Sequence, residues 1–435
     1  MSSGFLRSGA IYAAANFLAA GVPFLLLPIL TRALSPAAYG EVVSFFMIVP
    51  LCGALAGLSL HGAVGVRWLS QEKEDARGFT ATAVALVGAS TVVTATVAML
   101  IGSLLEIGLS PFQWGLAALL SGAMTIQSIR FVVWQSRSQA LPAATLQVAA
   151  SVSNILLSLI GVLVLGAGAD GRIAGAVIAG VLIATVSVLY LRREGIRDGL
   201  TAKAAKAQLR FGLPLLPHVA AGVLLTSADR FAVSAQLGSA ALGIYGVASQ
   251  IGLVMSVLAD AATKAYTPSL YRQLGKDSLR GRLCIVGLTY LSIPFWLLLA
   301  LAGWGVLLLC GEALLGKNYQ PSLDLAIWFL LGGALNGIYL NVAALFFFTG
   351  RTEWISVSTV SAAILAMLLA PMATAYAGLR GAAAAYVLAQ LFMLVLAWLL
   401  SLRVSPMPWR HPVAALRLFL RQTGFQANLS RRVPA

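Results

Sequence analysis

The chain has 435 residues, of which 60% are hydrophobic and only 10% are charged, and its mean hydropathy is +0.90. An ordinary soluble domain carries roughly 25% charged residues, so this composition excludes a water-soluble protein and predicts an all-α polytopic membrane protein. The net charge of +15 comes from basic residues that flank apolar runs rather than alternate with aromatic residues, so we expect no nucleic acid partner. Cys52, Cys284 and Cys310 lie in or beside apolar runs, so we expect no disulfide framework, metal site or cofactor.

Apolar runs separated by glycine, proline or charged clusters predict about 12 transmembrane helices, because about 20 apolar residues cross the hydrocarbon layer. The first run follows Arg7 as a signal peptide would, but it is about twice as long as a signal's apolar region, so we expect it to remain as a helix. The first six runs lie near residues 10–34, 40–66, 79–105, 112–134, 143–166 and 171–191. The second six lie near residues 209–235, 242–266, 283–310, 322–348, 354–376 and 379–402.

Basic residues are distributed unevenly between the two sides of this membrane topology. Of the 29 lysines and arginines, 23 lie in segments on the same side as the N-terminus. The opposite side has four, which are Arg32, Arg172, Lys317 and Arg380. The positive-inside rule therefore predicts that both termini are cytoplasmic. No outer loop exceeds about a dozen residues, which disfavours an enzyme with an outer catalytic domain, such as a polymerase or ligase.

The tail, residues 403–435, is basic. Apolar and basic residues recur in it at helical spacing, namely Val413, Leu416, Arg417, Leu420 and Arg421. This pattern is typical of an amphipathic helix on the inner membrane surface. An unstructured basic tail is the alternative interpretation.

An internal repeat is visible when the chain is shifted against itself by 203 residues. Without a gap, Leu6, Arg7, Gly9, Leu34, Ala37, Ala38 and Gly40 then match Leu209, Arg210, Gly212, Leu237, Ala240, Ala241 and Gly243. Each copy holds six predicted helices, so we expect two six-helix bundles, in residues 1–200 and 201–402. An even number of helices keeps the orientation, which predicts a parallel repeat about an axis along the membrane normal and a substrate site between the halves.

Two short motifs predict backbone features rather than chemistry. Gly311–Asn318 is similar to a phosphate-binding loop, but it ends in Asn rather than Ser or Thr and follows no predicted strand, so we expect a loop and helix cap. Pro214 and Pro217 remove backbone donors near the start of the seventh predicted helix and predict a kink or break there.

Several segments together resemble one family of membrane proteins. The first hairpin, Leu26–Gly40, is similar to the opening of the polysaccharide transporters, the O-antigen and exopolysaccharide flippases. Further segments that resemble this family are Leu209–Pro214, Ala228–Phe231, Ala241–Ala248, Pro268–Tyr271, Thr349–Thr352 and Gly378–Ala383. The chain is thereby identified as a member of the multidrug, oligosaccharidyl-lipid and polysaccharide exporter superfamily.

This resemblance implies two six-helix bundles around a central cleft, in the bacterial inner membrane. It implies a transporter, not an enzyme, that moves a polyprenyl-diphosphate-linked oligosaccharide to the outer leaflet by alternating access. The partners it implies are that substrate, membrane lipids and, as candidates, the polysaccharide polymerase and export machinery. The alternatives are an exporter of drugs or other small amphiphiles, which usually needs acidic membrane residues, and a lipid II flippase, which usually has fourteen helices.

Seven ionisable residues within the predicted helices are the candidate substrate-binding residues of the cleft. A charge at the centre of a membrane helix costs at least ~2.5 to 3.5 kcal/mol, so such residues normally face protein or a wet cavity. Counted from each helix start, one lies near mid-depth, two near the outer side and four near the inner side. In that order they are His218; Asp229 and Arg230; and His61, Arg130, Asp260 and Lys264.

The two arginines, Arg130 and Arg230, are the stronger candidates, because a guanidinium can bind a diphosphate through two hydrogen bonds. Arg130 has an alternative role, in which its side chain extends from the inner helix end to lipid headgroups. Asp229 is adjacent to Arg230, so the two side chains point about 100° apart. We expect one of this pair to anchor the bundle and the other to line the cleft.

The remaining candidates each have two interpretations. His61 and His218 can carry a proton in coupled transport because the unperturbed pKa of histidine is ~6.5, and polar packing is the alternative. Asp260 and Lys264 are four residues apart and can either face the cleft or form a local ion pair on one helix face.

Overall fold

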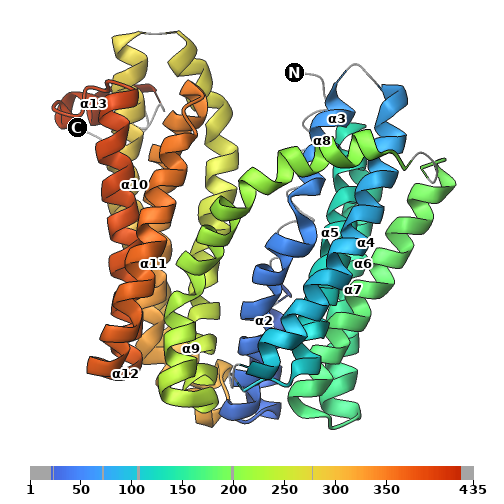
Figure 1. Cartoon of the computed structure of the whole chain (residues 1–435). Helices are drawn as coiled ribbons and strands as arrows, with labels where there is room; N and C mark the ends of the chain where they lie inside the picture. Colours follow the sequence, from blue (N-terminus) through green and yellow to red (C-terminus); the bar gives the residue numbers. More distant parts are fainter. Residues whose placement is uncertain are drawn as a thin grey trace. The chain divides into compact units, whose positions relative to one another are not determined.

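Helices make up all of the regular secondary structure in the residues that the computed structural model describes (Figure 1). These residues are 21–22, 24–70, 73–104, 108–196, 200–276 and 278–422. The predicted all-α fold is confirmed. The segments before residue 21 and after residue 422, which include Leu6, Arg7 and Gly9 of the repeat, lie outside the described residues.

The chain divides into two compact units. Unit 1 comprises Met1–Val247 and Leu314–Gln320, and unit 2 comprises Ala248–Ala313 and Pro321–Ala435. The helices that begin in unit 1 are Phe24–Ala33, α2 (Pro36–Gly57), α3 (Leu60–Leu69), α4 (Lys73–Leu104), α5 (Pro111–Ser136), α6 (Ala140–Leu159), η1 (Ile160–Val164), α7 (Gly168–Arg193), α8 (Ala202–Gly212), η2 (Leu213–Leu215), α9 (Leu216–Gly275) and η3 (Lys317–Tyr319). Those that begin in unit 2 are α10 (Leu279–Leu314), α11 (Pro321–Thr349), α12 (Glu353–Val404) and α13 (Pro412–Gln422).

The number of membrane spans agrees with the sequence. Nine helical stretches in the described part of the chain are long and apolar enough to cross a membrane. Two of them contain a bend, at Gly238 in α9 and at Ala377–Gly378 in α12, so each supplies two spans. The shorter helix Phe24–Ala33 is the described end of the first predicted span. Together these account for the twelve predicted helices.

Local sequence explains where the helices begin and turn. The Ser35 side chain accepts a hydrogen bond from the Ala38 amide and caps α2, with Pro36 at the first helical position. Ser110 forms a capping box with Gln113 at the start of α5. Gly238 adopts φ 80°, a conformation that other residues rarely take, and this separates the two arms of α9.

The connection into α9 changes helix type close to Pro214 and Pro217, where the sequence predicts a kink or break. The α-helix α8 passes into the 3-10 turn η2 before α9 begins at Leu216. A Cβ added to Gly212 would lie 2.1 Å from the Leu58 carbonyl oxygen, so the end of α8 approaches the break between α2 and α3 closely. The Gln208 amide donates to the Phe79 carbonyl oxygen at 2.7 Å. These contacts join α8 to unit 1. The division into halves at residues 1–200 and 201–402 stays a prediction.

Each unit has its own apolar core. In unit 1, Phe45, Ile48 and Trp114 are among the buried residues where α2, α5 and α7 meet. In unit 2, Trp296 packs with α11, where a Cβ at Gly337 would lie 2.8 Å from the indole ring. Small residues therefore allow neighbouring helices to pack closely.

Candidate functional site

The two matched turns of the internal repeat meet within unit 1. A Cβ at Gly40 would lie 1.9 Å from the Ser239 carbonyl oxygen, and a Cβ at Gly243 would lie 2.0 Å from the Pro36 carbonyl oxygen. The shift of 203 residues that aligns the repeat pairs Pro36 with Ser239 and Gly40 with Gly243. Each contact is therefore the equivalent of the other, as contacts around a two-fold axis are.

A third matched pair lies directly on this contact. Val43 and Gly246 are separated by the same 203 residues, and a Cβ at Gly246 would lie 2.3 Å from the Val43 Cγ2 atom. A residue that touches its own equivalent lies next to the symmetry axis. The described residues thus support the predicted parallel repeat.

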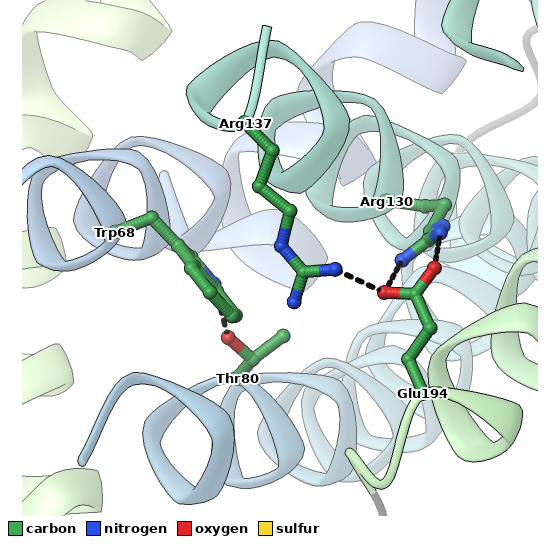
Figure 2. Close-up of polar contacts among 5 residues, drawn as sticks. All are labelled: Trp68, Thr80, Arg130, Arg137 and Glu194. Atoms are coloured by element: carbon green, nitrogen blue, oxygen red, sulfur yellow. Dashed lines mark hydrogen bonds and ion pairs between the residues drawn. The ribbon is translucent and has the colours of Figure 1, made fainter. Parts of the chain in front are cut away.

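Arg130 lies inside unit 1 with its charge paired (Figure 2). Its side chain is 0% exposed, and its Nη1 and Nη2 atoms donate to the two carboxylate oxygens of Glu194, with Nη1 at 3.0 Å from Oε2. The guanidinium lies 3.8 Å from the centre of the Trp134 ring. The side chain therefore does not extend toward lipid headgroups. Its ion pair with Glu194 joins the end of α5 to the end of α7.

Arg137 binds the same carboxylate from the solvent side. Its Nη1 atom lies 2.5 Å from the Glu194 Oε2 atom, and its guanidinium lies 4.3 Å from the centre of the Trp68 ring. The Trp68 indole nitrogen in turn donates to the Thr80 hydroxyl at 2.9 Å, as Figure 2 shows. The network ties together α3, α4, α5 and the end of α7.

The electrostatics of this network hold Glu194 ionised. Partial burial raises the pKa of the Glu194 carboxyl, but the hydrogen bonds and charges of Arg130 and Arg137 outweigh that effect and keep the pKa below its usual range. Two cations and one carboxylate leave an excess positive charge at this end of unit 1.

Asp229 and Arg230 differ in burial and in hydrogen bonding, and their opposite charges interact. Asp229 is 3% exposed and accepts a hydrogen bond from the Tyr245 hydroxyl at 2.6 Å. Because Tyr245 follows the bend at Gly238, this bond joins the two arms of α9. Arg230 is half-buried, and its Nε atom has no hydrogen-bond partner in the described structure.

The other candidate residues form no hydrogen bond or ion pair with these networks in the described part of the chain. His218 is half-buried near the start of α9, and its buried Nδ1 atom has no hydrogen-bond partner among the described residues. His61 is exposed on α3. In unit 2, Lys264 and Asp260 form the predicted i,i+4 ion pair at 2.5 Å, with both side chains more than half exposed. The described contacts therefore do not gather the candidates into one cluster.

Arg172 is a buried residue that the sequence analysis missed, because its position near an outer loop suggested only a topology signal. It lies in α7 and donates to Asn154 Oδ1 at 3.0 Å and Ser158 Oγ at 2.8 Å. Its guanidinium lies 4.8 Å from the centre of the Phe46 ring. The only available signal was the pairing of polar residues on two neighbouring apolar helices.

The segment that is similar to a phosphate-binding loop serves packing. A Cβ at Gly316 would lie 2.1 Å from the Thr31 carbonyl oxygen, and the Gly316 amide donates to the Thr31 hydroxyl at 3.2 Å. The Tyr319 hydroxyl donates to the Leu34 carbonyl oxygen at 3.0 Å. The motif therefore comprises the last turn of α10, the turn at Leu315 and Gly316 and the start of η3, which agrees with the predicted loop and helix cap.

Comparison with known proteins decides the family. Residues 5–273, more than half of the chain, match the family described as "Polysaccharide biosynthesis protein". The chain belongs to this family. This polysaccharide biosynthesis family member is 26% identical over 365 residues to an uncharacterized membrane protein of Haemophilus influenzae, covering 82% of the chain and 87% of that protein. It is 23% identical over 375 residues to the Lsg locus putative protein 1 of the same organism, covering 82% and 88%.

Solved structures show that the fold of this family member is that of a known transporter superfamily. An inward-facing multidrug resistance MATE transporter of the MOP superfamily aligns with a TM-score of 0.67 and 18% identity, over 90% of this chain and 94% of that chain. The lipid II flippase MurJ in an inward closed conformation aligns with a TM-score of 0.68 and 14% identity, over 99% and 94%. The chain is a multi-pass membrane protein with this fold.

Proposed function

We propose that the protein is a flippase that moves a polyprenyl-diphosphate-linked oligosaccharide from the inner to the outer leaflet of the bacterial inner membrane. The observation that carries this proposal is the match to the polysaccharide biosynthesis family over residues 5–273. A fold shared with MATE transporters and with a lipid II flippase supports transport by alternating access. The charge bias of the loops supports a topology with both termini in the cytoplasm.

Arg230 is the residue that we propose to bind the substrate diphosphate. Its neighbour Asp229 accepts a hydrogen bond from Tyr245, and the Nε atom of the half-buried Arg230 guanidinium has no hydrogen-bond partner among the described residues. A planar guanidinium matches two phosphate oxygens at once. Arg130 is better suited to a structural role, because its charge is already neutralised by Glu194 inside unit 1.

Two other transport functions define the competing outcomes. An exporter of drugs or small amphiphiles is supported by the MATE fold, and a lipid II substrate is supported by the MurJ fold. The family match favours an oligosaccharide substrate over both. Polysaccharide polymerase and export machinery are the protein partners that this function would require.

Deletion of the gene tests the proposal. We expect one surface polysaccharide to disappear while its lipid-linked precursor accumulates on the inner leaflet, and the wild-type gene to restore both. A change in drug susceptibility with normal polysaccharide would instead support drug export. Loss of peptidoglycan synthesis would support a lipid II substrate.

A further inference from the structure

The C-terminal helix α13 is a fixed part of unit 2. Ala415 is 0% exposed, and a Cβ at Gly287 of α10 would lie 2.4 Å from the Ala415 carbonyl oxygen. This close approach of two backbones shows that one face of α13 packs on protein. Of the two interpretations of the tail, residues 412–422 therefore form a helix rather than unstructured chain.

The linker before α13, residues 405–411, is also fixed to unit 2 by hydrogen bonds and ring contacts. The Tyr290 hydroxyl donates to the Trp409 carbonyl oxygen at 2.7 Å, and Arg282 donates to the Pro406 carbonyl oxygen at 3.2 Å. The Trp409 ring contacts that of Trp398 edge-on at a centroid distance of 6.1 Å. These contacts place α13 crosswise at the end of unit 2 where α12 finishes (Figure 1).

The opposite face of α13 is exposed and basic. Arg417 and Arg421 are one helical turn apart, and both are exposed together with Arg410 and Val413, whose exposed fraction is 60%. The sequence from Arg403 to Gln422 contains no acidic residue. The exposed surface of α13 and of the residue Arg410 before it therefore carries three guanidiniums beside the apolar side chain of Val413.

Further positive charge lies at the same end of unit 2. Arg272, Lys276 and Arg280 are exposed where α9 ends and α10 begins, and Arg282 links that turn to the linker of α13. With 11 residues, α13 is too short to cross a bilayer, so it must lie along the surface.

We propose that the exposed face of α13 binds the phosphate headgroups of anionic phospholipids in the leaflet that it faces. Positive charges next to a membrane attract anionic lipids, and Val413 would reach the boundary of the acyl chains. Because the opposite face packs on α10, binding requires no folding of the helix and little insertion. None of these residues is among the proposed substrate-binding residues, and the inference does not depend on the proposed function.

Thermal unfolding of the purified full-length protein, titrated with phosphatidylglycerol, tests the proposal. We expect phosphatidylglycerol to raise the unfolding temperature, and phosphatidylcholine to have little effect. The triple variant Arg410→Gln/Arg417→Gln/Arg421→Gln should need about 100-fold more phosphatidylglycerol for the same shift, because each arginine near an anionic surface contributes a factor of about 5. The corresponding triple lysine variant should keep most of the rise in unfolding temperature, since an anionic lipid surface attracts any positive charge.

A matched control removes three exposed arginines from unit 1, in the variant Arg77→Gln/Arg192→Gln/Arg193→Gln. It should respond to phosphatidylglycerol as the wild type does. The proposal is overturned if this control loses as much response as the α13 variant, or if the α13 variant loses none. It is also overturned if inorganic diphosphate stabilises the Arg230→Ala variant, which lacks the proposed substrate-binding residue, as well as phosphatidylglycerol does. If the glutamine variant does not fold, the lysine variant provides the test. A lysine variant that unfolds at the normal temperature without lipid, but does not respond to phosphatidylglycerol, would also overturn the proposal.

Discussion

Gly40 and Gly243 occupy equivalent positions in the internal repeat, and each lies against the main chain of the other copy. The carbonyl oxygens that they approach, those of Ser239 and Pro36, are themselves equivalent. Neither position has room for a Cβ atom, so the contact depends on glycine at both.

Substitution of either glycine should destabilise unit 1. A Cβ about 2 Å from a backbone oxygen must displace the main chain, and such overpacking typically costs about 1–3 kcal/mol. We expect Gly40→Ala and Gly243→Ala to lower the thermal unfolding temperature of the purified protein. The control is Gly88→Ala in α4, where a Cβ would meet nothing within 4 Å and should be neutral or stabilising. Unfolding temperatures equal to that of Gly88→Ala would contradict the close contact.

Removal of the Glu194 charge should cost more than removal of an exposed charge. Glu194→Gln leaves Arg130 buried without a counter-ion, and breaking such a pair costs about 3–5 kcal/mol when both groups are buried, so we expect somewhat less for this partly exposed carboxylate. The control Asp260→Asn breaks an exposed pair and should cost about 0–1 kcal/mol. Denaturant unfolding of both variants provides the comparison, and equal losses would argue against a structural role for the network.

The same carboxylate should make stability depend on pH in acid. The pKa of Glu194 is lowered in the folded protein, so its contribution is fully present above the unfolded pKa of ~4.3 and is lost as pH falls through the folded value. We expect the difference in unfolding temperature between wild type and Glu194→Gln to be constant near neutral pH and to shrink below about pH 4. If this difference in unfolding temperature instead grows as the pH falls, the pKa of Glu194 is not lowered in the folded protein.

Arg230 and Arg130 should respond differently to substitution. If Arg230 binds the diphosphate, Arg230→Ala should strongly reduce flipping while the protein level in the membrane stays near normal. Arg230→Lys should keep only part of the flipping activity, because an ammonium lacks the planar arrangement of donors that a guanidinium has. Arg130→Ala should instead lower the protein level, since it leaves Glu194 without its buried partner. Normal flipping by Arg230→Ala would remove this residue from the mechanism.

Membrane topology can be checked by labelling single cysteines in a variant that lacks Cys52, Cys284 and Cys310. A cysteine at exposed Gln320 should react with an impermeant reagent added from outside, and one at exposed Lys276 should react only after the membrane is opened. The uneven distribution of basic residues is the reason for this expectation. The reverse labelling pattern would show that both termini lie outside rather than in the cytoplasm.

The class, the number of helices and their approximate positions were predictable from the sequence alone. Apolar length and the positions of basic residues are properties of single segments, and turns such as Ser35–Pro36 and Gly238 depend on side chains and dihedral angles within a few residues. Such local interactions form in the same way whatever the surroundings are. The internal repeat was also visible in the sequence, because it is detected by comparing residue identities at a fixed shift.

Only the tertiary structure decided what the buried charges do. Arg130 finds its partner 64 residues away, in Glu194 at the end of α7, and Arg172 finds polar partners on another helix. Sequence spacing predicted the Asp260–Lys264 pair because both lie on one helix face, one turn apart. A pair between helices depends on which helices are neighbours and how far each is rotated, and apolar packing along their whole length sets both.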